Sequence, residues 1–78
     1  MTIEDFITNF ADQFENTDQN IFHENTEFRS LEEWSSLHAL LIIAMIYECY
    51  HINMTGSELR HSNTILDLFN IVHTKRGE

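Results

Sequence analysis

The sequence predicts an all-α domain, a four-helix bundle of three main helices and one short helix, with a long first loop. Apolar residues recur at helical spacing in several segments, and no segment shows the alternation typical of a strand. Four segments begin with serine or threonine, which are preferred helix N-caps. The 78 residues include no proline, and 42% are hydrophobic. A chain of this size forms one small core, so we expect a single domain spanning 1–78.

The first helix is expected to begin at Thr2-x-x-Asp5, where the threonine caps the helix and an acid follows three residues later. Its expected core residues are Ile3, Phe6, Ile7, Phe10 and Phe14. The polar run 15–20 should end this helix, because short polar side chains compete for backbone hydrogen bonds. No helical period persists from about residue 16 to residue 33, which predicts a long loop. The residues expected to hold the loop against the bundle are Ile21, Phe22, Phe28 and Leu31.

The second helix is expected to begin after the N-cap Ser35 and to end near residue 50. It contains few polar residues, and two of them, His38 and Glu48, lie within about 80° of each other around a helix axis. We therefore expect Leu41 and Met45, which fall between them, to be exposed. The residues expected on the opposite, core-facing side are Ala39, Leu40, Ile43, Ile46, Tyr47 and Tyr50.

Two further caps predict the remaining helices. Thr55-x-x-Glu58 predicts a short third helix that ends near residue 61, and Thr64-x-x-Asp67 predicts the fourth. The apolar face of the fourth helix is formed by Ile65, Leu68, Phe69 and Val72.

The charge and composition exclude several kinds of partner. A net charge of −9 argues against nucleic acid, because phosphates would be repelled. The single cysteine suits a reducing cytoplasm, and the apolar segment 39–47 is too short to span a membrane. No basic and apolar leader is visible, and no histidine or cysteine pair has zinc-ligand spacing. We expect a cytoplasmic domain with no membrane partner and no metal.

The run Glu33-Trp34-Ser35-Ser36-Leu37 places two serines at the beginning of the apolar second helix. Over residues 28–72 the chain resembles one branch of the acyl carrier protein family, in helix order and in several motifs. The other motifs that carry this resemblance are Phe28-x-x-Leu31, Thr55-Gly56-x-x-Leu59-Arg60 and Asn63-Thr64-Ile65-x-Asp67-Leu68. The family's attachment signature is Asp-Ser-Leu, so Ser36 takes the place of the modified serine. Ser35 stands where the family has aspartate.

The resemblance implies a discrete acyl carrier protein with no enzymatic activity of its own. A phosphopantetheinyl transferase would attach 4′-phosphopantetheine from coenzyme A to Ser36. The arm would then carry acyl or aminoacyl groups as thioesters between acyl-loading and acyl-using enzymes. A phosphate at this position is favoured by the partial positive charge of a helix N-terminus. The expected partner-binding residues are Trp34, Ser35, Leu37, His38, Leu41, Met45 and Glu48.

Other interpretations of the same residues remain open. The chain could be an unmodified small helical interaction module, in which Ser35 and Ser36 only cap the helix. A hydrolase is disfavoured, because positions i and i+2, here Ser36 and His38, do not face each other on a helix. Trp34 is expected to pack against the first helix rather than to project into solvent. The apolar exposed face of the second helix indicates a hydrophobic partner or a weak homodimer.

Overall fold

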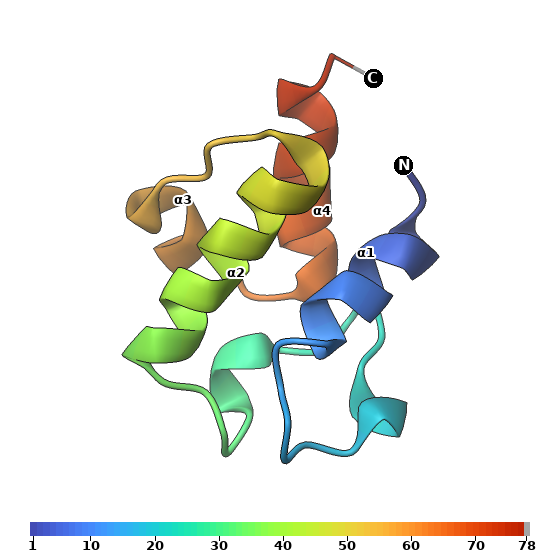
Figure 1. The fold of residues 1–78 in the computed structure, drawn as a ribbon, viewed down its shortest axis with the longest axis vertical. Helices are drawn as coiled ribbons and strands as arrows, with labels where there is room; N and C mark the ends of the chain where they lie inside the picture. Colours follow the sequence, from blue (N-terminus) through green and yellow to red (C-terminus); the bar gives the residue numbers. More distant parts are fainter. Residues whose placement is uncertain (78) are drawn as a thin grey trace.

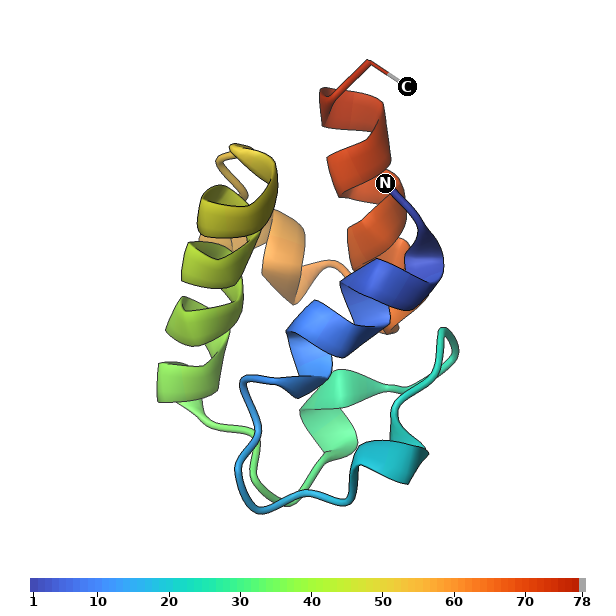
Figure 2. The ribbon, with the colours of Figure 1, turned by 45° about the vertical axis from the view of Figure 1, so that its right-hand side comes forward.

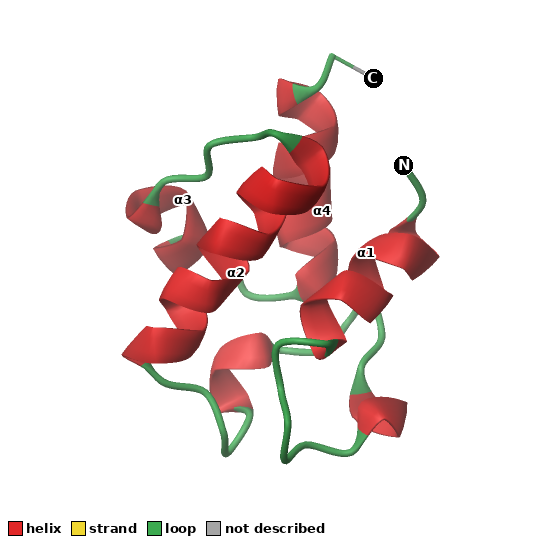
Figure 3. Ribbon diagram, in the orientation of Figure 1, coloured by secondary structure: helices red, strands yellow, loops and turns green. Residues whose placement is uncertain are grey.

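The computed structural model describes residues 1–77, and these form α-helices and short 3₁₀ turns with no β-strand (Figure 3). The α-helices are α1 (Ile3–Ala11), α2 (Ser36–Tyr50), α3 (Gly56–Arg60) and α4 (Ile65–Lys75) (Figure 1). The long first loop contains two 3₁₀ turns, η1 (Gln19–Ile21) and η2 (Phe28–Ser30). The prediction of an all-α domain with three main helices and one short helix is confirmed.

Each α-helix begins at the N-cap that the sequence predicts. The side chains of Thr2, Ser35, Thr55 and Thr64 each accept a hydrogen bond from the backbone N–H three residues later. In α3 and α4 the acid at that third position also accepts from the cap N–H, which completes a capping box. These bonds satisfy backbone N–H groups that have no partner inside the helix, so each helix has a defined first residue.

The core is rich in phenylalanine and joins α1 to the first loop. The ring of Phe10 lies 5.4 Å from that of Phe14, 6.1 Å from Phe22 and 5.8 Å from Phe28, measured between centroids. Phe22 and Phe28 are buried, as predicted for residues that hold the loop in place. Ile21 is exposed, contrary to the prediction, because the side chain of Phe22, which follows it directly, takes the core position at the end of η1.

The helices are arranged around this core. α1 packs against α4 and α2, and α3 packs against α2. In Figure 2, α2 lies on one side of the molecule, α1 and α4 lie on the other, and the first loop crosses below them. This arrangement brings the first loop to the start of α2. Among residues 1–77, no helix combines the length and the apolar character needed to cross a membrane.

The predicted orientation of α2 is wrong. Met45, expected to be exposed, is only 4% exposed, and Leu41 is half-buried. Leu40 and Tyr47, expected in the core, are 65% and 51% exposed, and Ile43 is half-buried. The side of α2 that faces the core is therefore not the side that the sequence predicts.

The misleading residue is His38, which the prediction used to mark the exposed side. Its ring is 9% exposed and stacks on Phe14 at a centroid distance of 4.6 Å. Polar groups from Ser35 and Glu33 face its two ring nitrogens, so the histidine can be buried without leaving a polar atom unpaired. Ile46 is buried as expected. Because α2 is apolar on nearly every side, assigning one polar residue, His38, to the wrong side changes which face of the helix is predicted to be exposed.

Candidate functional site at the start of α2

Ser36 is the first residue of α2, and its side chain is exposed. Ser35 before it is extended, with φ −152° and ψ 175°, and caps the helix. The first N–H groups of a helix give this end a partial positive charge. The Ser36 hydroxyl is therefore open to solvent at a position that favours a phosphate ester. Leu37, which follows it, is also exposed.

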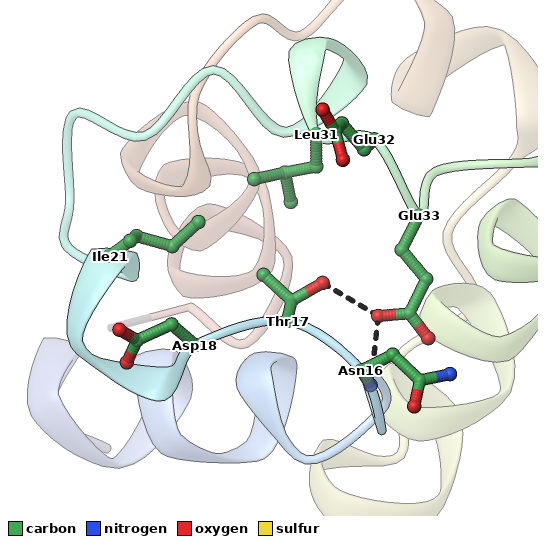
Figure 4. A pocket seen from close by; sticks show the side chains of 7 residues that line it. All are labelled: Asn16, Thr17, Asp18, Ile21, Leu31, Glu32 and Glu33. Atoms are coloured by element: carbon green, nitrogen blue, oxygen red, sulfur yellow. Dashed lines mark hydrogen bonds between the residues drawn. The ribbon is translucent and has the colours of Figure 1, made fainter.

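A chain of polar contacts connects the cap of α2 to the first loop. Ser35 Oγ lies 3.1 Å from His38 Nδ1, and His38 Nε2 lies 3.6 Å from Glu33 Oε2. Glu33 Oε1 accepts hydrogen bonds from Thr17 Oγ1 at 2.6 Å and from the Asn16 N–H at 3.1 Å (Figure 4). The Thr17 hydroxyl, with help from the Asn16 N–H and the nearby His38, lowers the pKa of Glu33 from its usual 4.5. The start of α2 is thereby fixed to the loop.

This chain also has the order hydroxyl, imidazole and carboxylate found in hydrolytic triads, with Ser35 in the place of the nucleophile. The sequence had suggested only Ser36 as a serine partner for His38. However, Ser35 Oγ also accepts the His38 N–H at 3.3 Å as the helix cap. The His38 ring is held against Phe14 in the core. These contacts indicate that the row of polar contacts from Ser35 to Glu33 has a structural role, which is to position Ser35 and Ser36.

Trp34 supports the same segment from the core side. Its ring lies 5.0 Å from that of Phe28 and 6.2 Å from that of Phe14, measured between centroids. Trp34 was expected to pack against the first helix; it packs against Phe14, which the sequence predicted in that helix but which lies three residues after the end of α1. The segment that leads to Ser35 is therefore held by packing and by hydrogen bonds.

An open groove of about 550 Å³ lies beside Ser36, between α2 and α3. Arg29 from η2 and Arg60 from α3 border it, and no carboxylate lines it. The Arg29 guanidinium is held by hydrogen bonds to the Leu59 carbonyl at 3.1 Å and to Asn63 Oδ1 at 2.9 Å. The residues that line the groove are Arg29, Trp34, Ser35, Ser36, Ala39, Leu40, Ile43, Gly56, Leu59 and Arg60.

A second hollow, of about 450 Å³, lies in the first loop and is lined in part by Glu33 (Figure 4). Three carboxylates line it, from Asp18, Glu32 and Glu33, together with Asn16, Thr17, Ile21 and Leu31. Within residues 1–77, no group of histidine, cysteine, aspartate and glutamate side chains is arranged to hold a metal ion. A phosphate next to Ser36 is electrostatically better placed in the groove between α2 and α3 than in this acidic hollow.

The exposed side of α2 continues from the groove as an apolar stripe, the α2 stripe, formed by Leu37, Leu40, Ala44 and Tyr47. Three of these are large hydrophobic side chains that are more than half exposed. The exposure of Leu40 and Tyr47 was not predicted, because the uniformly apolar helix contains no signal for it. Arg29 and Arg60 were not predicted at the site either, because they reach the groove from separate segments.

The predicted partner-binding residues fall into three groups. Ser35, Leu37 and Glu48 are exposed, as a direct contact requires. Trp34 and Leu41 are half-buried. His38 and Met45 are buried, so the expectation that they lie on an exposed face is wrong. His38 acts on this surface only through Ser35, which it helps to position.

No protein-family model, curated protein or solved structure matches this chain. The class of protein that the site suggests therefore depends on the motifs around Ser36 and on the geometry of the start of α2.

Proposed function

We propose that this chain is an acyl carrier protein and that Ser36 bears its 4′-phosphopantetheine. The observation that carries this proposal is the position of Ser36, an exposed hydroxyl on the first residue of α2. Leu37 follows it, in the register of the Asp-Ser-Leu signature. The order of a long first loop, a serine at a helix start, a short helix and a last helix is that of the acyl carrier fold, and it supports the proposal.

In this function the chain presents its hydroxyl and a separate transferase performs the chemistry. The Ser36 hydroxyl loses its proton to the transferase and forms a phosphodiester bond, and the nucleotide part of coenzyme A leaves. The chain needs no general base of its own next to Ser36. Its contribution is to expose the hydroxyl, to hold the segment before it through Trp34 and Glu33, and to offer a partially positive helix end. The bound arm supplies the thiol that carries acyl groups between acyl-loading and acyl-using enzymes.

The departure from the family signature is Ser35. Its oxygen still caps α2, accepting the His38 N–H, but it carries no charge. An aspartate at this position would keep the cap and add a favourable charge at the helix N-terminus. We therefore expect Ser35→Asp to raise the rate of loading by a broad-specificity transferase.

Intact-mass spectrometry with coenzyme A and a broad-specificity transferase tests the assignment. The wild type and Ser35→Ala should gain the mass of one phosphopantetheine, whereas Ser36→Ala should gain none. Ser35→Ala is the matched control, because it removes a hydroxyl one residue away. A Ser36→Ala variant that is still modified would contradict the assignment.

The second candidate is an unmodified helical interaction module with the same fold. The α2 stripe favours it, because an exposed apolar surface of this kind is typical of a binding surface. If the wild type gains no mass with any of several transferases, this second function is the better explanation of the structure.

A further inference from the structure

We propose that the groove and the α2 stripe form one docking face, and that its partner is a protein segment with apolar side chains flanked by carboxylates. In the acyl carrier family this face usually carries acids and meets basic enzyme surfaces. In the present chain two arginines, Arg29 and Arg60, border the groove. The proposal rests on this surface alone and concerns the chain with an unmodified Ser36.

The apolar part of the docking face includes residues of α2 and of the groove. Leu37, Leu40 and Tyr47 are 61%, 65% and 51% exposed along one side of α2. Ile43 and Leu59 continue the apolar surface into the groove. A small ligand in the groove would leave most of the α2 stripe uncovered. A helical segment that presents apolar side chains at helical spacing can cover both.

The charge that borders the groove is opposite to that of the chain. The net charge is −9, yet two of the four lysines and arginines, Arg29 and Arg60, border the groove. Neither forms an ion pair with a carboxylate of residues 1–77, whereas Lys75 is paired with Glu58 at 2.7 Å. Partner surfaces are arranged to complement local charge, so carboxylates on the partner fit these two guanidinium groups.

The Arg60 guanidinium lies close to the glycine that begins α3. A Cβ atom added to Gly56 would lie only 3.2 Å from Arg60 Nη1, so the guanidinium lies directly over the first residue of α3. The absence of a side chain at Gly56 leaves room for the Arg60 guanidinium beside the groove. The other cation, Arg29, is fixed by its hydrogen bonds to Leu59 and Asn63.

A second copy of this chain fits the docking face poorly. In a symmetric dimer the same patch lies on both subunits, so the arginines would meet a surface whose groove has no carboxylate lining. The remote carboxylates act weakly on a docked peptide at physiological salt, because charges are screened beyond about 8 Å.

A displayed library of helical peptides of about fifteen residues tests the proposal. Leucines are fixed at helical spacing on one face, and the flanking positions vary among glutamate, lysine and serine. Selection on the wild type should enrich glutamate at the flanks, despite the net charge of −9. The best binder and its twin with lysine in place of glutamate are then compared by fluorescence anisotropy at physiological salt. The acidic peptide should bind about three- to tenfold more tightly.

Three variants separate the parts of the docking face. Arg60→Gln should remove most of the preference for the acidic peptide, and Arg76→Gln, outside the groove, should retain it. Leu40→Ser should weaken both peptides by a similar factor, because it removes an exposed apolar contact. Enrichment of lysine, an absence of binders, or an undiminished preference in Arg60→Gln would overturn the proposal.

Sedimentation of the chain alone tests a second copy as the occupant. The wild type should be a monomer at the concentrations used for binding. A dimer that Leu40→Ser dissociates would assign the docking face to a second copy and contradict the proposal. Loading of Ser36 is measured separately by mass, so the failure of the proposed carrier function and the failure of this inference are distinguishable.

Discussion

The orientation of α2 predicts a large difference between two substitutions on the same helix. Met45→Ala removes a side chain that is 4% exposed and packed in the core. Truncations of this kind reduce the free energy of unfolding by about 2–5 kcal/mol, because they lose buried contacts and leave a cavity. Leu40→Ala removes a side chain that is 65% exposed, and surface changes usually stay within about 0.5 kcal/mol. Both variants introduce alanine into a helix interior, so the difference between them reports burial.

Thermal unfolding followed by circular dichroism measures this difference. For a domain of this size 1 kcal/mol corresponds to about 4–8 °C, so Met45→Ala should melt roughly 10 °C or more below the wild type. Leu40→Ala should melt within about 4 °C of it. Urea denaturation provides the corresponding free energies. If Leu40→Ala is as destabilising as Met45→Ala, or if Met45→Ala is neutral, the orientation of α2 described above is wrong.

Two further predictions concern the caps and acid stability. Ser35→Ala should lower the free energy of unfolding by about 1 kcal/mol, because the His38 N–H loses its cap. Ser35→Asp should match or exceed the stability of the wild type, because it keeps a cap oxygen and adds a negative charge at the helix N-terminus. Urea denaturation at neutral pH measures both variants, and an unchanged stability of Ser35→Ala would contradict the role of the cap. The hydrogen bonds from the Asn63 and Thr64 N–H groups lower the pKa of Asp67 from its usual 3.8. The native state therefore binds fewer protons than the unfolded state as the pH falls. The stability that results is fully present above the unfolded-state pKa of Asp67 and is lost as the pH falls through its lower native pKa. Urea denaturation between pH 7 and pH 3 should show a smaller loss for Asp67→Asn than for the wild type, and equal losses would refute this contribution.

Local chemistry made the helices predictable from the sequence. A cap such as Thr64 bonds to the N–H three residues later, so it acts within a single turn and leaves a readable pattern. The apolar spacing of α1 likewise places Phe6 and Phe10 in the core. The cap at Ser35 also placed Ser36 on the first residue of α2, but Ser36 was singled out by its resemblance to the Asp-Ser-Leu signature.

The face that α2 presents depended on the tertiary structure. The helix is apolar on nearly every side, so its sequence contains almost no information about which side is buried. The decisive contact is that of His38 with Phe14 and Glu33, which come from other segments. A histidine whose ring nitrogens face polar partners can be buried, and the sequence does not show whether those partners are present.

The surroundings of Ser36 were also decided by contacts between distant residues. Glu33 accepts hydrogen bonds from Asn16 and Thr17. Arg29, in the first loop, donates a hydrogen bond to the Leu59 carbonyl in α3. Such pairs have no fixed spacing, because they form only when the packed core brings separate segments together. The sequence by itself determined where the helices begin, and with that the place of Ser36 on the first residue of α2. Only the tertiary structure decided which side chains and which charge surround the Ser36 hydroxyl, since these follow from packing rather than from local pattern.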